Sequence, residues 1–192
     1  MPVPPCENRT KSALDLALRK LLEEKPLNQI RVREVTELCG IRRQSFYYHF
    51  PDVYALFDWS LQQERARLLA RQEACLTWQQ ALTDLLNHTA RNRAYYQSLL
   101  RSREDGSLRG LLGPVLEPIL AHTLEYYQLR CGIHQDDEQP TLECWKMMFL
   151  TLLEGWIQSE AQQPQQILST LDSMIQKGAL GAAWQNLPAQ PL

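Results

Sequence analysis

The sequence predicts an all-α protein with a three-helix, helix-turn-helix head at its N-terminus, followed by a connecting helix and a larger helical body. Apolar residues recur at three- and four-residue spacings along almost the whole chain, which is the period of one face of an α-helix. No alternation of apolar and polar residues is long enough to predict a β-sheet. With 192 residues, 44% of them hydrophobic, the chain can bury one or two cores. We therefore expect a helix-turn-helix domain over residues 8–52 and a helical domain over residues 53–182.

Two helices are predicted before residue 41. The first ends near Pro26, because a proline disfavours helical geometry in the residue before it. The second runs from about residue 32 to 38, with Val35 and Leu38 facing the core. Gly40 is expected to cap this second helix, because glycine adopts the left-handed backbone conformation cheaply. The first helix is defined by five apolar residues on one face, Leu14, Ala17, Leu18, Leu21 and Leu22.

A third helix is predicted from about Arg42 to His49, with Phe46 and Phe50 four residues apart on its inward face. The second and third helices, joined at a glycine, form a helix-turn-helix. A proline and an aspartate at positions 51–52 then break the chain. A fourth helix follows, carrying Leu56, Trp59 and Leu68.

The remainder keeps the helical period. Short helices are predicted near residues 77–89 and 95–100. Gly106 and Gly110 are expected to break the chain, with a longer helix starting after Pro114. A polar stretch over 131–140 predicts a loop, and two further helices are expected over 141–161 and 165–177.

The outer face of the third helix carries hydrogen-bonding side chains. Gln44 and Tyr48 lie opposite the two inward phenylalanines, with Ser45 and His49 on one flank and Arg43 on the other. Such groups are what a helix needs to read base edges in the DNA major groove. Spacing alone does not separate this interpretation from an ordinary solvated polar face, which amphipathic helices have by default.

The charge distribution favours the DNA interpretation weakly. The first 50 residues hold nine basic and six acidic side chains, which gives a local charge of +3. Because the net charge of the whole chain is −2, the remaining residues carry a charge of −5. A basic head on an acidic body is typical of DNA-binding proteins. A segment this short can also reach +3 by chance.

The sequence of residues 32–52 resembles that of the DNA-binding head of the TetR family of bacterial regulators. The matching features are Val32 and Val35, the Gly40-Ile41 pair, and the run Phe46-Tyr47-Tyr48-His49-Phe50-Pro51-Asp52. The resemblance extends over roughly residues 11–59 and implies an all-α regulator whose C-terminal domain serves ligand binding and dimerisation. Residues 42–50 and 57–59 are further similar to the branch that includes activators of dihydroxyacetone-kinase operons, which senses through a partner protein.

Carried over by position, the resemblance implies DNA contacts along the third helix. Tyr47 is expected to give its hydroxyl to a phosphate, and Arg42 to reach either a phosphate or a base. Many relatives have lysine where this chain has Val53, and Arg31, which replaces a usual threonine, is expected to compensate for that missing phosphate contact. The remaining implied contacts are Arg43, Gln44, Ser45, Tyr48 and His49.

The last two predicted helices are apolar on more than one side, which requires a second surface to pack against. The resemblance favours a four-helix interface between two copies, whereas the alternative is an entirely intramolecular core. The candidate interface residues are Leu142, Trp145, Phe149, Leu152, Trp156, Leu168, Leu171 and Ile175.

These features together predict a transcriptional regulator that binds a palindromic operator as a homodimer and responds to a small-molecule or protein effector. The alternative is a helical protein-interaction adaptor that keeps the head fold without reading DNA. The chain has no phosphate loop, nucleophile elbow or zinc-protease pattern, so no enzyme activity, cofactor or metal is expected. We expect a cytoplasmic protein, because five scattered cysteines suit free thiols and neither a signal peptide nor a membrane-length apolar run is present.

Overall fold

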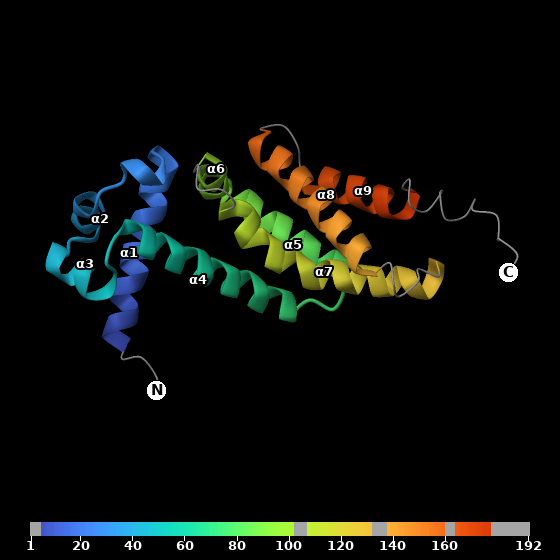
Figure 1. Cartoon of the computed structure of the whole chain (residues 1–192), viewed down its shortest axis with the longest axis horizontal. Helices are drawn as coiled ribbons and strands as arrows, with labels where there is room; N and C mark the ends of the chain where they lie inside the picture. The colour runs from blue at the N-terminus through green and yellow to red at the C-terminus, as the bar shows by residue number, and fades with distance from the viewer. Residues whose placement is uncertain (1–4, 102–106, 132–137, 160–163, 178–192) are drawn as a thin grey trace, which may run out of the picture. The chain divides into compact units, whose positions relative to one another are not determined.

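The computed structural model describes residues 5–101, 107–131, 138–159 and 164–177 (Figure 1). Over these ranges the chain is helical, with no strand, as the sequence predicts. A single 3-10 turn at Leu27–Gln29 separates the first two α-helices. The α-helices in chain order are α1 (Pro5–Glu24), α2 (Val32–Cys39), α3 (Arg43–His49), α4 (Val53–Glu73), α5 (Trp78–Arg91), α6 (Arg93–Arg101), α7 (Ser107–Cys131), α8 (Glu138–Gln158) and α9 (Pro164–Lys177).

The chain divides into two compact units. The head unit comprises Met1–Ala70 and Asn92–Leu112, and the body unit comprises Arg71–Arg91 and Gly113–Leu192. The predicted boundary between residues 52 and 53 falls inside the head unit, which also takes in most of α4 and all of α6. The polypeptide passes from one unit to the other within α4, between α5 and α6, and within α7.

The head unit is built around α1, which packs against α2 and α6. The five apolar residues that predicted α1 are all buried, so its amphipathic pattern is read correctly from the sequence. In α2 the core position is Val35, but Leu38 is 55% exposed, so its predicted inward orientation is wrong. Thr36 is buried instead, because the core-facing side of this eight-residue helix centres on residues 35 and 36.

The predicted break before Pro114 is also wrong. Helix α7 begins at Ser107 and continues through Gly110, Pro114 and Pro118, while Gly106 lies outside the described residues. A proline inside a helix leaves the carbonyl four residues earlier without its N–H donor. Within the head unit, Nη2 of Arg65 in α4 donates to the Gly110 carbonyl at 2.8 Å. A side chain distant in sequence thus replaces the bond that Pro114 cannot make, and the helix continues.

In the body unit α9 contacts both α5 and α8. Aromatic and aliphatic residues from α5 and α8 are buried, because each helix has an apolar face wide enough for several contacts. The buried residues include Trp78, Leu82, Leu86, Leu153 and Ile157. No described helix combines the length and the apolar character needed to cross a membrane.

Candidate nucleic-acid interface

Helix α2 is fixed at both ends by local hydrogen bonds. At its start the Glu34 carboxylate accepts the backbone N–H of Arg31 at 2.9 Å and pairs with Lys25, which follows α1. The hydrogen bond from Lys25, and then that from Arg31, holds the pKa of Glu34 below its usual value. At its end Gly40 takes φ +67° and ψ 27°, and the N–H of Ile41 binds the Thr36 carbonyl at 3.1 Å. This glycine turn directs the chain into α3.

Aromatic residues anchor the core-facing side of helix α3. Phe46 is fully buried and Phe50 is 5% exposed, with ring centroids 6.1 Å apart. The Phe50 ring also lies 5.7 Å from that of Trp59 in α4. Asp52 caps α4 by accepting the Ala55 N–H at 2.8 Å, which sets the direction of the chain leaving the head. The aromatic contacts fix the rotation of α3, and its polar residues consequently point outward.

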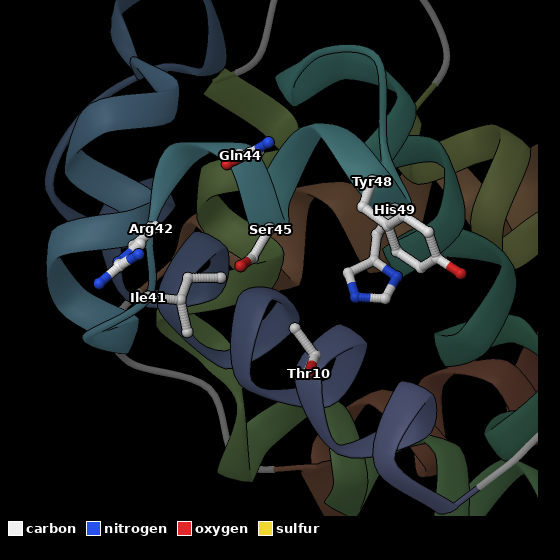
Figure 2. A pocket seen from close by; sticks show the side chains of 7 residues that line it. All are labelled: Thr10, Ile41, Arg42, Gln44, Ser45, Tyr48 and His49. Carbon is white, nitrogen blue, oxygen red and sulfur yellow. The ribbon is translucent and has the colours of Figure 1, made fainter.

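The outward residues line a hollow of about 440 Å³. Figure 2 shows Thr10 of α1 on one side of it, facing Ser45 and His49 of α3, with Arg42 and Tyr48 towards the two ends. The Nδ1 atom of His49 is buried and has no hydrogen-bond partner in the described part of the chain. The full set of lining residues is Thr10, Ile41, Arg42, Gln44, Ser45, Tyr48 and His49.

Two cations of this surface, Arg42 and Arg43, lie at the start of α3. Among the described residues no carboxylate forms an ion pair with Arg42 or Arg43, and both side chains are exposed. Elsewhere in the head, Arg33 pairs with Glu37 and Lys25 with Glu34. The arginines at the start of α3 therefore keep their full charge for an anionic partner.

Five of the eight predicted contact residues line the hollow: Arg42, Gln44, Ser45, Tyr48 and His49. The other three lie outside it. Arg43 and Tyr47 are exposed elsewhere on α3, and Arg31 is exposed at the residue before α2. Their contacts with DNA stay predictions.

Sequence reasoning missed Thr10. The hollow brings it next to α3, although it lies more than thirty residues earlier in the chain. No spacing pattern links the two segments, so the sequence carries no signal that would have identified Thr10.

Four of the eight predicted dimer residues lie in the interior of the protomer. Trp145, Phe149 and Trp156 are at most 6% exposed, and Leu142 is 9% exposed. Their burial is intramolecular, which was the alternative interpretation for these positions. Leu152 and Leu168 are half-buried, while the side chains of Leu171 and Ile175 lie outside the described residues. Their assignment to a subunit interface remains a prediction.

A different face of α8 is open. Four small or apolar residues on this face are exposed at three- and four-residue spacing, before the polar Gln158 continues the row, and Met147 is 59% exposed. These residues are Cys144, Met147, Thr151 and Gly155, which we call the α8 stripe.

Comparisons with known proteins agree with this architecture. A family model described as a transcriptional regulator C-terminal region of TetR type matches residues 76–177, more than half of the chain. The HTH-type dhaKLM operon transcriptional activator DhaS of Lactococcus lactis subsp. lactis (strain IL1403) is 28% identical over 90 residues. That match covers 47% of this chain and 48% of DhaS, so the chain spans about half the length of this curated relative.

Solved structures share the fold at low identity. A TetR transcriptional regulator from Streptococcus agalactiae 2603V superposes with a TM-score of 0.68 at 20% identity, covering 88% of this chain and 94% of that one. A TetR-family regulator from Streptomyces coelicolor gives a TM-score of 0.69 at 15% identity, covering 96% and 85%. The dihydroxyacetone kinase operon activator DhaS gives 0.57 at 19% identity, covering 91% and 94%. These descriptions are of transcriptional regulators and not of enzymes, as the sequence predicted. The chain belongs to the TetR family of DNA-binding transcriptional regulators.

Proposed function

We propose that this regulator binds a palindromic operator as a homodimer, with α3 in the major groove, and that an effector acting on the body unit controls its affinity for DNA. The observation that carries the proposal is the exposed edge of α3. Arg42 and Arg43 have no paired carboxylate among the described residues, and they adjoin the amide, hydroxyl and imidazole groups of Gln44, Ser45 and His49. This combination supplies charge for phosphates and directional donors and acceptors for base edges.

Dimerisation is supported by the α8 stripe. One recognition helix reads only a few base pairs, whereas a two-fold symmetric pair doubles the length of the site. An exposed methionine on an otherwise small-residue face suits close packing against the same face of a second copy, since a two-fold axis brings identical patches together. The stripe replaces the buried tryptophans and phenylalanine as our choice of contact surface.

The effector is proposed to be either a metabolite or a protein. DhaS is named an activator of the dhaKLM operon and of a dihydroxyacetone kinase operon, and the partial similarity to it makes genes of this kind the first target genes to test. The adaptor alternative makes the opposite prediction, because an adaptor would retain the fold and bind no operator.

The test is fluorescence anisotropy of the full chain against DNA tiles from its own upstream region, at two salt concentrations. The variant is Arg43→Ala. Lys20→Ala is the matched control, because Lys20 is an exposed cation on α1 about 15 Å along the helix from Thr10. The variant is expected to weaken binding to the preferred tile by roughly 1–3 kcal/mol if Arg43 contacts a base, or to lower the salt slope by about 1 if it contacts a phosphate.

Tight binding to one tile, with two chains bound per tile and an effect of Arg43→Ala that Lys20→Ala lacks, would support the proposal. Equal and weak binding to every tile would contradict it and favour the adaptor. One bound chain per tile would retain DNA binding but reject the homodimer.

A further inference from the structure

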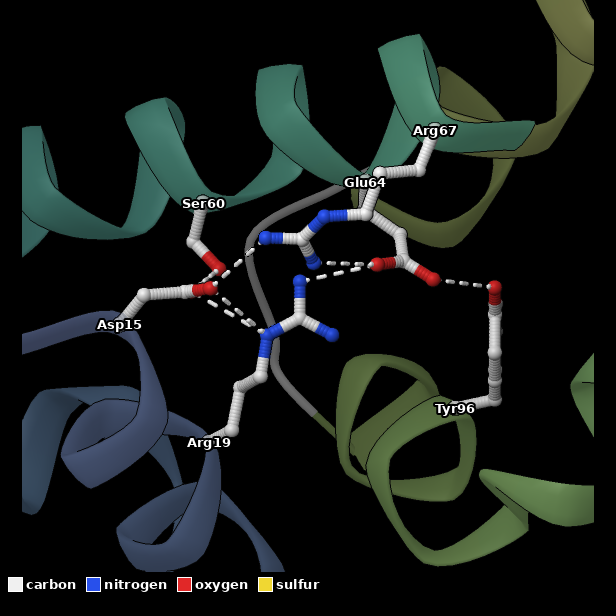
Figure 3. A network of polar contacts seen from close by, with 6 residues as sticks. All are labelled: Asp15, Arg19, Ser60, Glu64, Arg67 and Tyr96. Carbon is white, nitrogen blue, oxygen red and sulfur yellow. Dashed lines mark hydrogen bonds and ion pairs between the residues drawn. The ribbon is translucent and has the colours of Figure 1, made fainter. Parts of the chain in front are cut away.

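A cluster of charged side chains is buried inside the head unit, where α1, α4 and α6 meet (Figure 3). Asp15 of α1 and Glu64 of α4 are 4% and 1% exposed, which is rare for carboxylates. Two guanidinium groups, those of Arg19 and Arg67, balance their charges. A buried charge is tolerated only when it is paired and hydrogen-bonded, so the arrangement of these groups is closely constrained.

Glu64 is the centre of the cluster. Its Oε2 atom accepts hydrogen bonds from Arg19 Nη2 at 2.9 Å and from Arg67 Nη1 at 3.2 Å. Its Oε1 atom accepts the hydroxyl of Tyr96, on α6, at 3.0 Å. Burial first, and then the negative charge of Glu64, raise the pKa of Tyr96 well above its usual value, so this hydroxyl keeps its proton and acts as the donor. One carboxylate thus joins all three helices.

Arg19 is held from several sides. Its Nε lies 3.1 and 3.2 Å from the two oxygens of Asp15, and its Cζ lies 4.3 Å from the ring centroid of Tyr95 on α6. Asp15 also accepts the hydroxyl of Ser60 and lies 3.4 Å from Arg67 Nη2. A guanidinium fixed by its planar fork and by an aromatic face cannot slide as an apolar side chain can. The register of α1 against α4 and α6 is therefore defined by directed bonds.

The position of α6 in the chain gives this register a consequence. Helix α5, which precedes α6 in the chain, belongs to the body unit, as does most of α7 after it, whereas α6 itself belongs to the head unit. Helix α1 packs on α2, and α2 packs on α3. A displacement that reaches α6 through the chain therefore acts on Glu64 through Tyr96, and on α1 through Arg19.

We propose that Tyr96, Glu64 and Arg19 are positioning residues that tie α6 to α1 and so set the placement of the DNA-reading helix α3. The proposal rests on the proposed function only for the role of α3, because the tie between α6 and α1 exists whether or not DNA is bound.

The experiment is hydrogen exchange of the full chain without DNA, comparing wild type with Tyr96→Phe. Tyr54→Phe is the matched control, because it removes a phenol oxygen from a tyrosine on α4 whose side chain is 45% exposed. Losing a bond to a buried carboxylate is expected to accelerate exchange of α1 and α3 amides by about tenfold in Tyr96→Phe. Amides of α5 and α8 in the body unit serve as the internal reference and should keep their rates.

A second variant, Arg19→Lys, keeps the positive charge but loses the planar fork. It should accelerate the same amides as Tyr96→Phe and leave the body unit unchanged. Unchanged α1 exchange in both variants would overturn the proposal. Equal acceleration in head and body would overturn it too, because that pattern reports a general loss of stability.

Operator affinity supplies the link to function. Tyr96→Phe is expected to weaken binding to the preferred tile by about tenfold, with Tyr54→Phe matching wild type. If α1 opens but the affinity stays constant, the tie exists and its role in placing α3 is wrong. If wild type binds no tile, the proposed function has failed, and the exchange data still decide whether Tyr96 and Arg19 hold α1 to α6.

Discussion

Replacing Glu64 by glutamine should destabilise the protein more than any other single-atom exchange on α4. The substitution keeps the shape of the side chain and removes its negative charge. An amide oxygen can still accept the Tyr96 hydroxyl, but the NH₂ group then faces the guanidinium groups of Arg19 and Arg67. Donors would then face donors around a side chain that is only 1% exposed.

The magnitude follows from the exposure of each partner. A hydrogen bond to a charged group contributes about 1.5–3 kcal/mol, and Arg19, with a side chain 16% exposed, should lose most of that amount. The Arg67 side chain is 51% exposed, so solvent screens its pair and its loss adds no more than about 1 kcal/mol. We expect a decrease of about 2–4 kcal/mol in the free energy of unfolding, or about 5–15 °C in Tm for a chain of this size.

The assay is urea unfolding followed by circular dichroism at 222 nm and by tryptophan fluorescence. Glu73→Gln, an exposed glutamate on the same helix, is the control and should stay within about 0.5 kcal/mol of wild type. The double variant with Arg19→Gln completes a thermodynamic cycle and should show a coupling energy above about 1 kcal/mol. A loss below about 1 kcal/mol for Glu64→Gln, indistinguishable from the control, would refute the view that Arg19 depends on this carboxylate.

Two further outcomes are expected in the body unit. Met147→Glu places a charge on the α8 stripe, which we propose as the homodimer contact, and should convert the dimer to a monomer in light scattering after gel filtration. Gln79→Glu, on the exposed surface of α5, is the control and should remain dimeric. A Met147→Glu protein that remains dimeric would show that the interface lies elsewhere. Asp84 accepts two hydrogen bonds from Arg71, at 2.6 and 2.7 Å, and this hydrogen bonding lowers the pKa of Asp84. The free energy of unfolding that the pair contributes is therefore present above the ordinary aspartate pKa and is lost as the pH falls through the lowered pKa. Because the two side chains are 41% and 35% exposed, the loss below about pH 4 should be under about 1 kcal/mol, and Asp84→Asn should flatten that part of the profile of unfolding free energy against pH; an unchanged profile would show that the pair contributes nothing.

The head could be predicted well because its signals are local. Phe46 and Phe50 are four residues apart and face the core, and Gly40 occupies the left-handed position that its place after α2 requires. Both properties depend on the backbone within one or two helical turns, and such periodicity is written directly in the sequence. The outward direction of Gln44, Ser45 and Tyr48 follows from the same geometry.

The sequence was less informative where an interaction joins distant segments. It wrongly predicted a break before Pro114, because nothing near that proline indicates that Arg65 supplies a donor to the Gly110 carbonyl. It also placed Leu38 in the core, because one turn of apolar spacing does not show where a short helix meets its neighbour.

By itself, the sequence determined the helical class, the helix-turn-helix and the family, since these depend on local periodicity and on a continuous motif. Only the tertiary structure decided that Thr10 faces α3, that the large aromatic residues of α8 lie inside the protomer, and that Glu64 joins Arg19 to Tyr96. The physical reason is that a buried charge and a shared hollow are properties of several helices at once. Their energies depend on which groups packing brings within hydrogen-bond distance, and no single stretch of sequence contains that information.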